Sequence, residues 1–147
     1  ALELTPFTVP HDAREPLQLR CSDGDTHLGV LTDLGHGSAH VIASLQACHA
    51  LLLECNHDPE LLAQSSYPAF LKKRIAGPLG HLSNAESAQL ASALVHPRLN
   101  LLVAAHLSER NNLPSLARTT LAQAANCPED DIQVADPLLG TAWFTVQ

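Results

Sequence analysis

The chain has 147 residues, of which 46% are hydrophobic, and its formal net charge is −7. A chain of this length and composition can bury one sizeable core, so we expect a single domain. The excess of acidic over basic residues argues against broad non-specific binding of nucleic acid. Because no apolar run reaches the roughly 18 residues that a transmembrane helix needs, we expect a soluble, cytoplasmic protein.

The cysteines do not form a recognisable site. Cys21, Cys48, Cys55 and Cys127 include neither a C-x-x-C pair nor zinc-finger spacing. We therefore expect reduced, buried thiols instead of a disulfide framework or a thiolate metal site. Histidine is the unusual residue here, with nine in the chain.

The beginning of the chain predicts strands and then a helix. Residues 2–9 form the first candidate strand, and residues 18–23 and 26–33 form a hairpin across the turn Asp23-Gly24-Asp25. Ser38 is a suitable N-cap for a helix over residues 39–47.

Helices and strands then alternate. Ser83 and Glu86 form a capping box, and Asn112 is a candidate N-cap for the last helix. The further helices are expected at residues 58–64, 67–76, 84–95 and 113–125. The further strands are expected at residues 50–53, 99–105, 131–136 and 141–146. This order is typical of an α/β layered domain in which helices cover a sheet.

Residue types that bind divalent metals follow three of the predicted strands. His11 follows the first strand, Asp33 follows the strand that ends the hairpin, and His106 ends the apolar run LNLLVAA. For any one of them, the alternative is a polar residue with satisfied hydrogen bonds at a strand end. If the three strand ends lie side by side, these residues form a candidate metal site.

Two other stretches carry ionisable side chains. The strand at 50–53 ends in a polar segment that contains Glu54, His57 and Asp58, and His81 precedes a helix N-terminus, which suits anionic groups. The basic run Lys72-Lys73-Arg74 lies beside Tyr67 and Phe70 on a predicted helix, where a solvated face is the favoured interpretation.

Five segments stand out when they are taken in order and spacing. They are VPHDAREP at 9–16, LTDLG at 31–35, LLLECNHD at 51–58, YPAFLKKRIAGPLGHLSNAESAQL at 67–90 and AAHLSERNN at 104–112. Together they resemble the C-terminal half of metallo-β-lactamase-fold hydrolases, and the branch that they resemble most is the DNA exonuclease and phosphodiesterase group related to RNase Z. The resemblance implies a four-layered αβ/βα sandwich of which residues 1–147 supply about the C-terminal half.

The resemblance also implies a site with two divalent metal ions that act as Lewis acids, zinc foremost, with manganese or iron as alternatives. His11 and His106 match metal-ligating histidines, and Asp33 matches the carboxylate that bridges both ions. His81 matches a histidine near the scissile phosphate. Glu54 matches the glutamate of the H-E-A-T motif of RNase Z, but Leu53 replaces the histidine of that motif.

The remaining roles are expectations of the same kind. His57 is the natural substitute for the missing histidine, so His57 and His81 are the candidate general acids. The candidate substrate-binding residues are Asp58, Ser108 and Asn111.

The H-x-H-x-D-H signature of the family is absent from these residues. The resemblance therefore implies about another hundred residues upstream, either in the same chain or as a partner chain, and a homodimer is one candidate assembly. When complete, the protein is expected to hydrolyse phosphodiesters, with nucleic acid among the candidate substrates. The alternatives are hydrolysis of a thioester or lactam, and a non-catalytic binding module or a fragment that needs a complementary chain.

Overall fold

The computed structural model describes residues 1–147 and contains one six-stranded sheet in which neighbours along the chain are neighbours in space. The strands are β1 (Glu3–Thr8), β2 (Leu17–Ser22), β3 (His27–Leu31), β4 (Ala50–Glu54), β5 (Leu101–Ala105) and β6 (Ile132–Val134). The first three pair antiparallel, and β3 to β6 pair in parallel. The carboxyl ends of the parallel strands therefore share one edge of the sheet.

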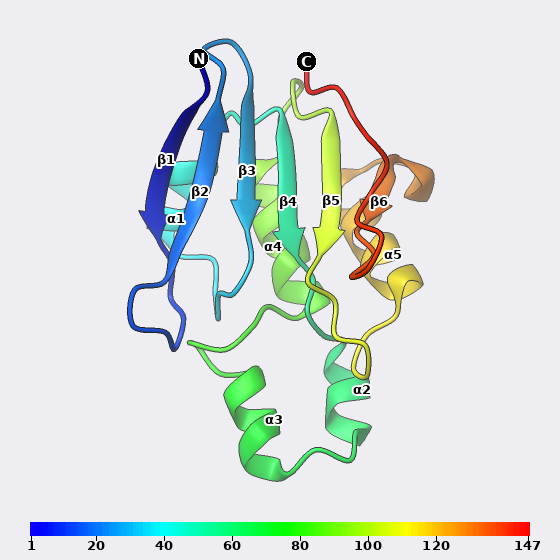
Figure 1. The fold of residues 1–147 in the computed structure, drawn as a ribbon. Coiled ribbons are helices and arrows are strands. Elements are labelled where there is room, and N and C mark those ends of the chain that lie inside the picture. The colour runs from blue at the N-terminus through cyan, green and yellow to red at the C-terminus, as the bar shows by residue number, and fades with distance from the viewer.

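Three helices cover one face of this sheet, and two lie beyond its edge. Figure 1 shows α1, α4 and α5 behind the strands, whereas α2 and α3 project below the carboxyl ends of β3, β4 and β5. The helices are α1 (Ala39–Leu45), α2 (Pro59–Gln64), α3 (Ala69–Ile75), α4 (Asn84–Leu94) and α5 (Pro114–Ala125), followed by a 3₁₀ turn at Glu129–Asp131. None of them combines the length and the apolar character that crossing a bilayer requires.

The hydrophobic core lies between the sheet and the covering helices. Alternate residues of each strand point to the helices, because successive side chains of a β-strand lie on opposite faces of the sheet. The largest strand residues of this core are Phe7, Leu31, Leu51, Leu53, Leu102 and Ile132. They pack in one cluster with the helix residues Val41, Leu45, Leu90, Leu94 and Leu121.

The opposite face of the sheet is also apolar, but no helix covers it. Strand pairing places Leu19, Val30, Leu52 and Val103 in one row across this face. Towards β1 the row is open to solvent, since Leu19 is 38% exposed and Leu4 is 54% exposed. In Figure 1 the C-terminal segment crosses the β6 side of this face.

Most of the predicted elements are confirmed within a few residues. The Ser38 cap and the Ser83–Glu86 capping box are both present. All four cysteines are free, but the prediction that they are buried holds only for Cys48 and Cys55, because Cys21 and Cys127 are partly exposed. The prediction of a strand at 141–146 was wrong, because this segment pairs with no strand and is preceded by the small Asp136–Gly140 bridge.

The prediction that Asn112 caps the last helix was also wrong. The N-cap of α5 is Leu113, and it makes no side-chain capping bond. The Asn112 amide instead turns inward, where it bonds the side chain of Asn84 and the carbonyl oxygen of Cys55.

Candidate metal centre

Four potential metal-ligating side chains meet at the carboxyl edge of the parallel strands. Asp33 follows β3, Glu54 ends β4, His106 follows β5, and His81 lies in the loop before α4. One ligand atom from each lies within 4.8 Å of the other three. We call Asp33, Glu54, His81 and His106 the metal-site cluster.

Glu54 is the centre of this cluster. Its Oε1 accepts hydrogen bonds from His106 Nδ1 at 2.7 Å and from His81 Nδ1 at 2.9 Å. Three backbone N–H groups, those of Asp33, Leu34 and Leu82, also donate to this carboxylate. Both imidazoles use Nδ1 for Glu54, so the Nε2 atom of each ring is left available for a ligand.

The electrostatics of Glu54 follow from these bonds. Burial by itself would raise the pKa of this fully buried carboxyl, but the hydrogen bonds from His106, His81 and the Leu82 N–H outweigh it and lower the pKa to about 2. In turn, the hydrogen bond to Glu54 raises the pKa of His106, against the opposing effect of burial. The buried carboxylate is therefore ionised at neutral pH and fully paired.

The exposed rim of the cluster is formed by Asp33 and His106. Their side chains are 44% and 42% exposed, and the distance from His106 Nδ1 to Asp33 Oδ1 is 3.7 Å. Both residues have positive φ angles, 54° for Asp33 and 57° for His106. A left-handed backbone at a non-glycine residue is costly, and such strain concentrates at functional sites.

His11 lies at the margin of the cluster. Its Nε2 is 3.9 Å from Asp33 Oδ1, and its ring centre is 5.2 Å from that of His81. Its Nδ1 lies 3.0 Å from the carbonyl oxygen of Gly80, the residue before His81. This bond makes Nδ1 the protonated nitrogen and turns the Nε2 lone pair towards Asp33.

Tight packing around residues 78–80 sets the place of both His11 and His81. A Cβ on Gly35 would overlap the backbone of Pro78, and a Cβ on Gly80 would overlap the carbonyl oxygens of Arg74 and Ile75. The absence of a side chain at these two glycines lets the segment pass between the Asp33 loop and the end of α3.

The structure places the other predicted site residues outside the cluster. The ring of His57 is 2% exposed, its Nδ1 has no hydrogen-bond partner, and burial lowers its pKa. The Asp58 carboxylate caps α2 through the N–H groups of Glu60 and Leu61. Ser108 Oγ accepts a bond from the N–H of Asn111. The roles predicted for these residues stay predictions.

Glu54 is the member of the cluster that the site prediction from sequence omitted. The available signal was its place directly after a buried strand, the same signal that singled out Asp33 and His106. Its contact with two histidines that lie 27 and 52 residues further along the chain is a property of the tertiary fold.

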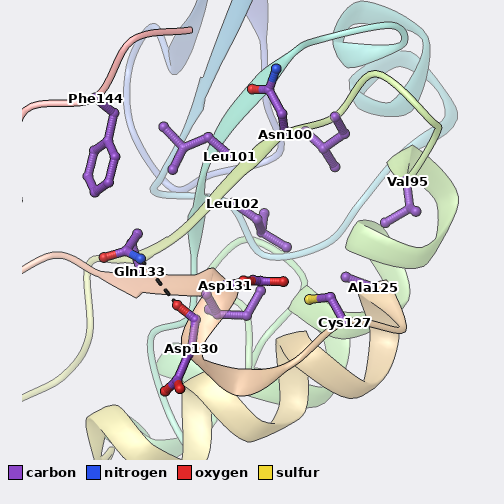
Figure 2. Close-up of a pocket in the computed structure, with 12 residues that line it drawn as sticks. Val95, Asn100, Leu101, Leu102, Ala125, Cys127, Asp130, Asp131, Gln133 and Phe144 are labelled. Atoms are coloured by element: carbon purple, nitrogen blue, oxygen red, sulfur yellow. Dashed lines mark hydrogen bonds between the residues drawn. The ribbon is translucent and has the colours of Figure 1, made fainter. Parts of the chain in front are cut away.

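A cavity of about 480 Å³ lies elsewhere in the molecule and contains no member of the cluster. Figure 2 shows it near the amino ends of β5 and β6, where Leu101, Cys127, Asp131 and Phe144 are among its lining residues. The parallel strands therefore separate this cavity from the metal-site cluster at their other ends.

The donors of the cluster fit a divalent metal ion. The Asp33 carboxylate and the free Nε2 atoms of His81 and His106 are donors that zinc, manganese and iron(II) all accept, whereas both oxygens of Glu54 are already hydrogen-bonded. With His11 at the margin, the chain offers four such side chains. A two-metal centre, with four or more ligands per ion, needs donors beyond these four.

Comparisons with known proteins find relatives that are named exodeoxyribonucleases. No protein-family model matches the chain. The chain is 32% identical to "Exodeoxyribonuclease YycJ" of Bacillus anthracis over 83% of its own length and 46% of the relative. It is 35% identical to "Exodeoxyribonuclease WalJ" of Streptococcus pneumoniae over 96% of its own length and 54% of the relative. The chain thus spans about half the length of the curated relatives it matches.

Solved structures establish the fold. The metallo-β-lactamase-fold protein YhfI from Bacillus subtilis superposes with a TM-score of 0.69 at 16% identity, over 97% of this chain and 49% of YhfI. Zinc-bound PqqB from Methylobacterium extorquens superposes with a TM-score of 0.59 at 17% identity, over 91% of this chain and 48% of PqqB. The resemblance found in the sequence is confirmed: the chain is similar to the exodeoxyribonucleases YycJ and WalJ over most of its own length, and it has the metallo-β-lactamase fold over about half the length of its solved structural neighbours.

Proposed function

We propose that this chain carries part of the active site of a metal-dependent nuclease that hydrolyses DNA phosphodiesters. The observation that carries the proposal is the convergence of Asp33, Glu54, His81 and His106 within 4.8 Å at one edge of the sheet. The names of the YycJ and WalJ relatives support DNA as the substrate.

In this proposal Asp33, His106 and His11 hold the metal, of which two ions are expected and zinc is the foremost candidate. A bound divalent metal supplies Lewis acidity that polarises a phosphate oxygen. Glu54 orients the imidazoles of His81 and His106 by accepting a hydrogen bond from Nδ1 of each ring.

Of the two histidines expected to protonate the leaving oxygen, His81 is favoured over His57. The His81 side chain is 24% exposed at the cluster, whereas the His57 ring is buried. A general acid must come within hydrogen-bond distance of the substrate, and only His81 is accessible enough to do so in this structure.

We also propose that residues 1–147 are the C-terminal portion of a single metallo-hydrolase domain. Two observations support this. The chain matches about half of each relative, and the row Leu19, Val30, Leu52 and Val103 makes one sheet face apolar with no helix over it. A second sheet packed on this face would complete a four-layered sandwich and bring the further metal ligands.

The test is metal content and catalysis by the full-length protein that contains this chain. Wild-type protein, purified and metal-loaded, should retain divalent metal in elemental analysis and hydrolyse both bis(p-nitrophenyl) phosphate and a DNA oligonucleotide. Asp33→Asn and His106→Ala should each lower hydrolysis by at least a hundredfold and reduce the metal content.

The matched control is His40→Ala, which removes an exposed histidine of α1 that lies outside the cluster. It should behave as wild type in both assays. Wild-type rates in Asp33→Asn and His106→Ala, or a wild-type protein that retains no metal, would show that the proposal is wrong.

A further inference from the structure

The segment from α2 to His81 differs in charge from the rest of this acidic protein. Residues 61–85 contain Lys72, Lys73 and Arg74 and no carboxylate, in a chain whose net charge is −7. Arg74 is the only one of the three that forms an ion pair, with Asp12 at 2.6 Å. Lys72 Nζ donates to the carbonyl oxygen of Ala63 in α2, and Lys73 is exposed and unpaired.

The helix that carries these cations has no role in the core. None of the residues of α3 is buried, and Phe70, one of five aromatic residues in the chain, is 73% exposed on it. Figure 1 shows α3 projecting away from the sheet, beyond the carboxyl ends of its parallel strands. An exposed aromatic ring beside unpaired cations on such a helix contributes nothing evident to stability.

This helix is nevertheless fixed in position beside the metal-site cluster. The N–H of His81 donates to the carbonyl oxygen of Ile75, the last residue of α3, at 2.8 Å. The Arg74–Asp12 ion pair ties α3 to the loop after β1, which contains His11. The C-terminal end of α3 is therefore held next to the point where His81 enters the cluster, and Lys73 and Phe70 precede it on the same helix.

We propose that α3 is a binding surface for the single-stranded end of a nucleic acid and guides that strand to the metal-site cluster. Lys73 and Lys72 contact backbone phosphates, and a base stacks on Phe70. Single strands are bound in this way without sequence preference, by cations along the backbone and aromatic rings under the bases. This inference rests on the proposed nuclease function and adds the position of the bound single-stranded DNA on the protein.

The experiment measures binding without cleavage. The assay is fluorescence anisotropy with a labelled 12-nucleotide single-stranded DNA and the full-length protein, in the presence of EDTA. It gives the dissociation constant at several salt concentrations. Phe70→Ala should weaken binding about tenfold. Lys73→Ala should weaken it several-fold and reduce the slope of log K against log salt by about 1, and Lys73→Arg should restore both.

Matched controls come from residues far from α3 in the chain. Arg98→Ala removes an exposed cation between α4 and β5, and Trp143→Ala removes a fully exposed aromatic ring of the C-terminal segment. Both should bind as wild type does. Wild-type binding by Phe70→Ala and Lys73→Ala, or equal losses in the two controls, would overturn the proposal.

The two proposals fail in different ways. If the nuclease proposal alone is wrong, the DNA is not cleaved when metal is present, yet Phe70→Ala and Lys73→Ala still weaken binding. If the α3 proposal alone is wrong, Asp33→Asn abolishes cleavage while substitutions in α3 leave binding unchanged.

Discussion

The Oε1 atom of Glu54 lies 2.7 Å from His106 Nδ1, so a carboxylate at the end of β4 is bonded to the imidazole that follows the neighbouring strand β5. Because Glu54 is fully buried, the position of its oxygen is set by the sheet and not by solvent. The orientation of the His106 ring is therefore fixed before any ligand arrives.

Glu54→Gln should weaken metal binding by about 10- to 100-fold, because the amide removes the negative charge and can no longer accept equally from two imidazoles. Competition for Zn²⁺ with a chromophoric chelator measures the affinity, and circular dichroism checks that the fold is kept. Glu60→Gln, an exposed change in α2, is the control. An unchanged affinity in Glu54→Gln would contradict the role given to this carboxylate.

His57 should make the protein less stable as the pH falls. Burial lowers the pKa of His57 below its ordinary value of about 6.5, so the unfolded chain binds the proton more tightly than the folded one. The contribution of His57 to the free energy of unfolding is therefore fully present well above pH 6.5 and is lost as the pH falls below that value. Urea unfolding at pH 7.5 and 5.5 should show a smaller loss for His57→Gln than for wild type, whereas the exposed control His40→Gln should lose as much as wild type.

Much of the site could be predicted because it lies at strand ends. Asp33 and His106 each follow an apolar run, so the run predicts that both residues lie at the end of a strand. Parallel pairing of these strands then places both residues at the same edge of the sheet. The capping box at Ser83 was predictable because its signal, a serine three residues before a glutamate, is local. Elements whose signal lies within a few residues were found correctly.

The errors concern features that depend on distant residues. The segment 141–146 has residues that favour strands, but β-propensity is realised only where a neighbouring strand accepts the hydrogen bonds. Asn112 is a good N-cap by composition, yet Asn84 and Cys55, 28 and 57 residues away, bind its side chain instead. Neither partner lies among the few residues around Asn112 on which the N-cap prediction was based.

Ser83→Ala should lower the free energy of unfolding by about 1 kcal/mol, with a range of roughly 0.5–2. The Ser83 side chain accepts from the N–H of Glu86 and so caps α4, which begins at Asn84, three residues after His81. Gln89→Ala, on the exposed face of the same helix, is the control and should change stability little. Denaturant unfolding followed by circular dichroism gives both values, and equal stability of Ser83→Ala and wild type would contradict the capping role.

Gly80→Ala should damage both stability and metal binding. The added methyl group would overlap the carbonyl oxygens of Arg74 and Ile75, which are backbone atoms that cannot rotate away. We expect a loss of about 1–3 kcal/mol in the free energy of unfolding, and weaker Zn²⁺ binding because the Gly80 carbonyl that bonds His11 must move.

The control for this change is Gly37→Ala, whose methyl group would meet only the flexible end of Leu90, at 3.0 Å. A clearly smaller loss of stability and unchanged Zn²⁺ affinity are expected there. If Gly80→Ala is as stable as Gly37→Ala and binds Zn²⁺ like wild type, close packing at residue 80 does not position the histidines. If Gly80→Ala is less stable but binds Zn²⁺ normally, the packing supports the fold while His11 is positioned by other contacts.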